Sequence, residues 1–310
     1  MKYLFAAVAV APLIAGMAHA QAEDEVRIEQ PVIVTLPGLQ RTAGELVSNV
    51  AALDRKEIVE SLASTLGDTL DRQPGVASTS FGQGASRPVL RGLGAERVQV
   101  LTNGIGVIDV SAASPDHQVA TDGIDAQKVE ILRGPAALVY GGQAIGGVVN
   151  VIDGLIMEDL PKRTFGGEAY AAGNSVNDGT EGGVRVQAVG GPLVLTLTAS
   201  QRNFDDYDFP GMAESDRLHA LEEAEEGGAH EEEVHSSGTL ENSFVDTQTY
   251  AGGLSWIGET AFLGLAVRRA ESQYGLPGSS HEHDEEEHEG EEDNEEALPF
   301  IDMEQTRYDL

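Results

Sequence analysis

The pattern of apolar and polar positions opens with two short helices. Asp54, with Glu57 three residues later, forms a D-x-x-E arrangement that satisfies free amides and so predicts a helix start. Leu66 and Leu70 share one face of a second predicted helix, which ends at residues 74–75 because proline cannot continue the hydrogen-bond ladder. The first ordered region of the chain is therefore expected to begin near residue 53.

Short apolar runs separated by turn residues follow these helices and predict strands. The pair Asn103 and Gly104 is a strong hairpin signal, because both residues tolerate positive φ. Pro135 opens a turn or helix before the glycine-rich residues 141–147. The predicted strands cover residues 88–90, 97–101, 105–107, 128–132 and 148–152. Residues 53–153 are thus predicted to form a compact α/β domain with a small mixed sheet.

The rhythm changes after Pro161 to segments of about ten residues in which apolar and polar positions alternate, as in tilted membrane-spanning strands. These segments are residues 164–173, 181–190, 193–201, 247–257 and 260–271, and residues 304–310 resemble the start of a sixth. Tight turns alternate with long connections, residues 202–246 and 272–303. Membrane barrels begin at about 8 strands, so residues 160–310 are expected to be antiparallel strands of an incomplete outer-membrane barrel, either a truncated one or a piece that cannot insert alone. A soluble β-sandwich is the alternative that periodicity leaves open.

The N-terminus has the pattern of an export signal. Lys2 precedes an apolar run over residues 4–16, and Ala18 and Ala20 give the small-x-small pattern of a cleavage site. Residues 1–20 are expected to be removed, because the run is shorter than the roughly 20 apolar residues of a membrane span. The sequence has 0 Cys, which excludes a disulfide scaffold and a catalytic thiol.

The formal net charge of -33 argues against a nucleic-acid partner, which would need clustered Lys and Arg. The excess acid is concentrated in residues 222–233 and 282–296, which are predicted to be solvated loops. No Walker loop, G-x-S-x-G or H-E-x-x-H motif is present, so neither an enzyme nor an organic cofactor is expected.

Residues 21–52 are polar, apart from an uncharged stretch held between Pro31 and Pro37. Such a stretch stays extended, and it could add as a strand to the sheet edge of another protein. A plain linker is the alternative.

Four runs carry a resemblance to a known family: LGDTLDRQPGV at residues 66–76, PVLRGL at 88–93, VEILRGP at 129–135 and GGVVN at 146–150. In this order they resemble the plug of TonB-dependent outer-membrane receptors. The resemblance implies a globular plug inside a barrel of about 22 strands, of which this chain would hold an N-terminal fragment. It also implies an outer-membrane location with the plug facing the periplasm and the barrel in contact with outer-membrane lipid.

The resemblance further implies TonB, with its inner-membrane energising complex, as a partner. The uncharged stretch lies where such receptors keep the TonB box. The residues of that box would be Val32, Ile33, Val34 and Thr35.

Within this family the sequence looks most like zinc-uptake receptors of the ZnuD type. Residues 109–117 (DVSAASPDH) resemble the plug loop in which those receptors place an Asp-His metal pair. The resemblance makes Asp116 and His117 the candidate ligands of a transported zinc ion, with other divalent metals possible. By their residue types alone, the same two residues also fit an ordinary polar turn.

The long acidic connections supply further candidate ligands, because His is the commonest metal ligand and carboxylates concentrate cations. These candidates are His230, His235, His281, His283 and His288. Solvated acidic loops without a metal site are the alternative.

Two other functions stay open. A TonB-dependent receptor for a siderophore, haem or cobalamin would share the plug, although acidic loops would repel an anionic ferric siderophore. A truncated, secreted acidic protein that buffers metal would bind cations without transporting them.

Overall fold

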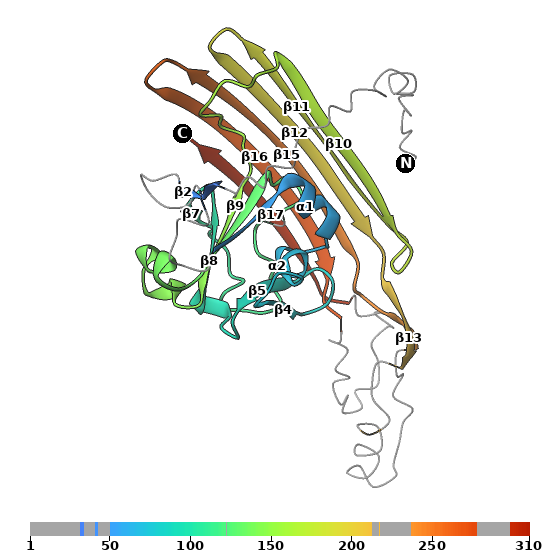
Figure 1. The fold of residues 1–310 in the computed structure, drawn as a ribbon. Coiled ribbons are helices and arrows are strands. Elements are labelled where there is room, and N and C mark those ends of the chain that lie inside the picture. Colours follow the sequence, from blue (N-terminus) through green and yellow to red (C-terminus); the bar gives the residue numbers. More distant parts are fainter. Residues whose placement is uncertain are drawn as a thin grey trace, which may run out of the picture.

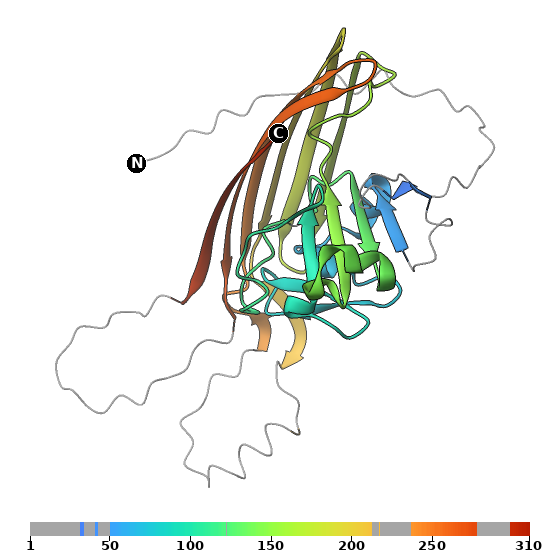
Figure 2. The ribbon, with the colours of Figure 1, turned by 90° about the vertical axis from the view of Figure 1, so that its left-hand side faces the viewer.

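The computed structural model describes residues 50–121, 123–212, 217, 237–277 and 298–310, together with the backbone of residues 32–33 and 41–42. A small α/β domain lies against one face of a curved antiparallel sheet, which is called the wall below (Figures 1 and 2). The predicted export signal lies outside the described residues. Near the N-terminus, β1 (Val32–Ile33) pairs with β2 (Arg41–Thr42) in an antiparallel ladder.

Both predicted helices are present: α1 (Arg55–Ser61) and α2 (Leu66–Leu70). The capping box of α1 is complete, since Glu57 N donates to Asp54 Oδ1 and Asp54 N donates to Glu57 Oε2, each over 2.9 Å. Ile58 of α1 is fully buried. The capping box therefore fixes the start of α1, and one face of the helix packs in the core.

The central sheet of the domain has five strands in the order β3 (Val50–Asp54), β8 (Lys128–Leu132), β9 (Gly147–Ile152), β6 (Val98–Thr102) and β7 (Ile105–Gly106). Strands β6 and β9 are parallel and the other pairs are antiparallel, which confirms the predicted mixed sheet. Asn103 and Gly104 form the predicted turn with φ of 51° and 81°. Short 3-10 turns η2 (Ala95–Arg97), η3 (Gly134–Tyr140) and η4 (Gly142–Ala144) connect the strands.

Two strands of the domain differ from the prediction. β5 (Ser86–Leu90) stays out of the mixed sheet and pairs with β4 (Val76–Ser80), because α2 packs across this hairpin and Thr65, at its N-cap, bonds to Ser86. β3 begins at Val50, inside the segment expected to be a linker, because its five residues pair with the whole length of β8.

The wall has six antiparallel strands in chain order, and they match the predicted segments. They are β10 (Phe165–Asn174), β11 (Gly179–Gly190), β12 (Leu193–Phe204), β15 (Val245–Ile257), β16 (Phe262–Gly275) and β17 (Phe300–Asp309). The predicted fold class, an α/β domain followed by antiparallel barrel strands, is confirmed. β10 and β17 form the two edges of this sheet.

Parts of the connections predicted as loops are ordered strand. β12 and β16 run to Phe204 and Gly275, and β13 (Tyr207–Met212) pairs with β14 (Ser237–Leu240) inside residues 202–246. The reason is that ladder bonds join backbone groups, so a strand continues past the point where its side chains turn polar.

The two faces of the wall have opposite character. Exposed apolar residues cover the outer face, among them Leu195, Leu197, Trp256, Leu263 and Leu265. Buried polar residues line the inner face, among them Thr196, Arg202, Thr249, Arg268 and Ser272. This alternation is typical of a barrel with an apolar surface towards lipid and a polar interior. Among the described residues, no helix is both long and apolar enough to cross a membrane.

The ends of the wall also differ. Tight turns at residues 190–193 and 257–262 close the end called the turn end below. The opposite end, called the loop end, is where β12 and β16 lead into the long connections. In both views the turn end extends above the α/β domain, which lies beside the lower part of the wall (Figures 1 and 2).

Candidate metal site and the contacts that seat it

The loop of residues 109–120 carries the predicted Asp-His pair, and a single carboxylate closes this loop. Asp109 Oδ1 accepts from Ser111 N and Asp109 Oδ2 accepts from Ala120 N, each over 3.0 Å. Arg87 Nη1 lies 3.8 Å from Asp109 Oδ1, and the two side chains are 10% and 9% exposed. Burial lowers the pKa of Arg87, and the charge of Asp109 opposes that shift. A buried ion pair thus fixes both ends of the loop.

Asp116 and His117 lie beside each other, half-buried, in the middle of this loop. His117 Nδ1 is 3.0 Å from Asp116 Oδ1, and Ser114 Oγ donates to the same oxygen. The bond from Ser114, followed by the bond from His117, holds the pKa of Asp116 below its ordinary value. In the tautomer that donates from Nδ1 to this carboxylate, Nε2 of His117 keeps a lone pair for a ligand.

The Asp-His pair lies at the loop end, where β16 contacts its backbone. Tyr274 Oη accepts from Gln118 N over 2.8 Å and donates to Asp116 O over 3.3 Å. The two side chains of the pair are 26% and 32% exposed. The structure therefore brings the predicted pair to the strand that leads into residues 276–299.

The other predicted ligands lie outside the described residues. They are His230, His235, His281, His283 and His288. Val34 and Thr35 of the predicted TonB box also lie outside them, whereas Val32 and Ile33 form β1. In the part of the chain that the structure describes, no group of three or more His, Cys, Asp or Glu could hold a metal ion.

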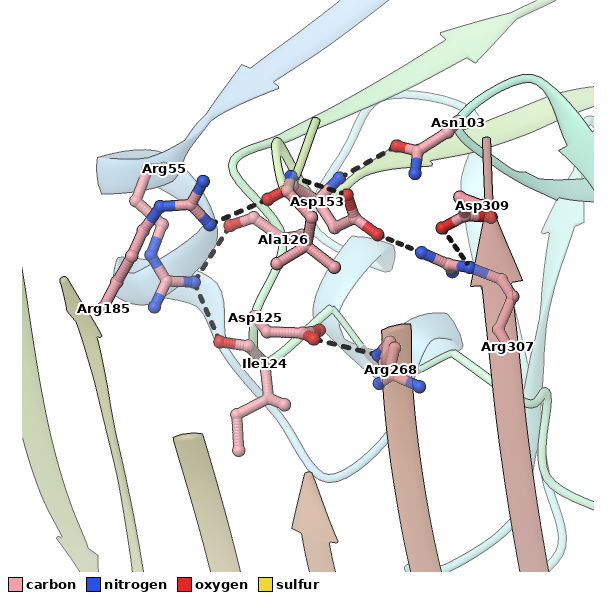
Figure 3. Close-up of polar contacts among 11 residues, drawn as sticks. Arg55, Asn103, Ile124, Asp125, Ala126, Asp153, Arg185, Arg268, Arg307 and Asp309 are labelled. Carbon is pink, nitrogen blue, oxygen red and sulfur yellow. Dashed lines mark hydrogen bonds and ion pairs between the residues drawn. The ribbon is translucent and has the colours of Figure 1, made fainter. Parts of the chain in front are cut away.

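Arginines of the wall form a second set of functional candidates, which the sequence analysis missed. Arg268 Nε donates to Asp125 Oδ2 over 2.9 Å. Arg307 pairs with the Asp153 carboxylate, and Arg185 Nη1 donates to Asp153 O over 2.8 Å (Figure 3). Two acids of the α/β domain are thus neutralised by the wall.

Two further arginines extend this contact. Arg202 of the wall donates to Ser64 O over 2.6 Å and to Ala63 O over 2.9 Å. In the opposite sense, Arg55 of α1 donates to Glu168 Oε1 of the wall over 3.0 Å. The arginines therefore fasten the α/β domain along the wall, in a protein whose overall charge is strongly negative.

Comparison with known proteins identifies the domain. Residues 42–148 match the model of the TonB-dependent receptor plug domain. This segment is a TonB-dependent receptor plug. The matched residues include the plug loop with Asp116 and His117 and end within β9.

Relatives extend the match beyond the plug. The vitamin B12 transporter BtuB of Vibrio vulnificus is 30% identical over 154 residues, which cover 49% of this chain and 25% of that protein. The pyoverdine outer membrane receptor FpvA from Pseudomonas aeruginosa matches with a TM-score of 0.56 at 15% identity, over 78% of this chain and 30% of that one. The copper transporter OprC matches with a TM-score of 0.53 at 20% identity, over 74% of this chain and 31% of that one. The chain thus spans between a quarter and a third of each of these proteins.

Together these matches settle the fold. The wall beside the plug has the fold of barrel strands in the matched receptors, and the matches support the predicted outer-membrane location. The matched proteins are named as transporters and receptors, as expected for a chain that is not an enzyme. An outer-membrane location does not fit the alternative of a secreted buffering protein.

Proposed function

We propose that this chain belongs to a TonB-dependent receptor that imports a divalent metal ion, zinc first among them. One observation carries the proposal. The plug holds an ionised carboxylate and an imidazole side by side at the loop end, with Nε2 of His117 left for a ligand. Both contacts described for the Asp116 side chain fall on Oδ1, so Oδ2 remains as a second donor.

Zinc chemistry fits these donors. Zinc accepts imidazole nitrogen and carboxylate oxygen at about 2.0–2.2 Å and usually takes four ligands, so the pair supplies two at most. The remaining ligands would come from His281, His283 and His288, in the connection that follows β16, or from His230 and His235. A site shared between plug and connections suits a transporter, because a conformational change can dismantle it and release the ion.

Charge supports a cation as the cargo. The acidic segments at residues 222–233 and 282–296 belong to the two connections that leave the loop end. Such segments raise the local concentration of cations and repel anionic ligands. Other divalent metals remain candidates, because imidazole and carboxylate also bind copper and nickel.

Energy for transport would come from TonB and its inner-membrane complex. The stretch Val32 to Thr35 would be the TonB box, which adds as a strand to TonB after it leaves β2. The apolar outer face of the wall would contact outer-membrane lipid.

Uptake of radioactive zinc by cells that carry the full-length receptor tests the proposal. Asp116→Ala combined with His117→Ala should reduce uptake to the level of cells without the receptor. Glu158→Ala combined with Asp159→Ala, which alters two exposed acids outside the site, should leave uptake unchanged. Wild-type uptake in the first variant would refute the site.

Cobalamin is the second candidate cargo, because the curated relative that is 30% identical is a vitamin B12 transporter. Cells with the receptor would then take up labelled cobalamin, and zinc would not compete. Zinc uptake that cobalamin leaves unchanged would favour the metal.

A further inference from the structure

Tyr274 is the one wall side chain described as bonding to the backbone on both sides of His117. The carbonyl of Asp116 belongs to the peptide group before His117, and the N–H of Gln118 belongs to the peptide group after it. The Tyr274 hydroxyl donates to the first and accepts from the second. A single hydroxyl therefore fixes the backbone of the candidate ligand relative to the wall.

The side chain of Gln118 is fixed by the same strand. Ser272 Oγ donates to Gln118 Oε1 over 3.0 Å. Thr247 Oγ1 lies 3.0 Å from Ser272 Oγ, and since the Ser272 proton is used on Gln118, Thr247 is the donor in that bond. The turn that carries His117 thus rests on a short chain of wall hydroxyls.

The wall in turn holds Tyr274 rigidly. Its side chain is 0% exposed and packs with Phe204 and Val245 of the wall and Ala85 of the plug. Gly84 allows this packing, because a Cβ at that position would lie 2.5 Å from Tyr274 Cβ. Close packing therefore fixes the ring, and the bonds of its hydroxyl position the plug loop.

Tyr274 is also joined to the base of the connection that carries three candidate histidines. Leu276, two residues later, donates from its N to Pro299 O over 3.2 Å and so closes the two stems of that connection. Asn242 Nδ2 bridges the same stems, with 3.0 Å to Leu276 O and 2.7 Å to Pro299 O. Because only two peptide groups separate Leu276 from Tyr274, a displacement of these stems would also move Tyr274.

We infer that Tyr274 is a positioning residue for metal capture, which holds His117 in its ligand geometry and links it to the base of residues 276–299. This inference rests on the proposed function. Preorganising a ligand raises affinity because less ordering is left to occur on binding. Removing the hydroxyl takes away both of these backbone bonds, so affinity should fall about tenfold to thirtyfold.

The test uses Co²⁺ titration of the purified full-length receptor, followed by its visible absorption, with Zn²⁺ in competition. Tyr274→Phe keeps the ring and removes the hydroxyl. It should weaken Co²⁺ binding about tenfold or more and change the absorption bands that report ligand geometry. Tyr250→Phe is the matched control, because that tyrosine is 58% exposed on the outer face and contacts Gln248 at 3.4 Å.

His117→Ala separates this inference from the proposed function. If His117→Ala binds Co²⁺ like the wild type, the proposed function fails. If His117→Ala abolishes binding while Tyr274→Phe matches the wild type in affinity and spectrum, the inference about Tyr274 alone is overturned. If Tyr274→Phe does not fold, Ser272→Ala decides the question: weakened binding with an altered spectrum supports the positioning role, and wild-type binding overturns it.

Discussion

Replacing Asp125 by Asn removes the negative charge opposite Arg268 at nearly constant side-chain size, and it should loosen the plug from the wall. Asp125 Oδ2 and Arg268 Nε are 2.9 Å apart, and their side chains are 6% and 4% exposed. In the variant the buried guanidinium would face a neutral amide in place of the carboxylate drawn in Figure 3. The perturbation therefore acts on the strongest type of plug–wall contact in the described residues.

The magnitude follows from this burial. Breaking a buried ion pair by removing one partner costs about 3–5 kcal/mol, because the other charge stays desolvated. Since about 1.4 kcal/mol is a factor of ten, the equilibrium for local opening should rise by roughly two to four orders of magnitude. Replacing Arg268 by Met in the same molecule removes the buried positive charge and should restore part of the lost stability of the plug–wall contact.

Hydrogen exchange read by mass spectrometry on the full-length receptor measures this opening. The informative peptide spans residues 123–132, where Gln127 N donates to Ile152 O over 2.8 Å. Glu271→Gln is the matched control, because its pair with Arg269 lies on the same strand with side chains 47% and 50% exposed. Solvent screens such an exposed pair, so its loss should change exchange little. Exchange in Asp125→Asn within about fivefold of the wild type would refute the reasoning.

Three further perturbations test single contacts. Burial raises the pKa of Asp125, but the charge and hydrogen bond of Arg268 outweigh it and hold that pKa below its ordinary value. The stabilisation should therefore persist above about pH 4 and fade as pH drops through the folded-state pKa; exchange protection, taken relative to the intrinsic exchange rate at each pH, that stays constant as Asp125 becomes protonated would contradict this. Asp54→Ala loses the capping box and should lower plug stability in a denaturant titration by about 1 kcal/mol, which an unchanged midpoint would contradict. Gly253→Ala should speed exchange at residues 153–157, because its Cβ would lie 2.2 Å from Leu155 O. Gly166→Ala is the control, because the space around Gly166 is open, and equal effects of the two substitutions would contradict the close approach at Gly253.

Local chemistry made much of the fold predictable. Three features depend only on neighbouring residues and can therefore be predicted from the local sequence. They are the Asp54 capping box, the Asn103–Gly104 turn and the alternation of the wall strands. Strand β3 was missed because its sequence, VAALD, has neither β-branched enrichment nor clear alternation, and its pairing with β8 decides its conformation. Tertiary contacts override a weak local preference of this kind.

The candidate site was predictable in its residue types and not in its surroundings. Asp116 and His117 were singled out by resemblance, but the contact between Tyr274 and Asp116 spans 158 residues and leaves no local signal. The wall arginines had a usable signal. Arg202 and Arg268 occupy positions that alternation turns inwards, where an unpaired charge would be costly, so acidic partners and carbonyl acceptors could have been sought for them.

X-ray anomalous scattering at the zinc edge, from crystals of the full-length receptor soaked in zinc, addresses the metal site most directly. The account predicts an anomalous peak at about 2.0–2.2 Å from His117 Nε2 and within ligand distance of Asp116, at the loop end of the wall. Zinc peaks confined to other positions, with none at this pair, would contradict it.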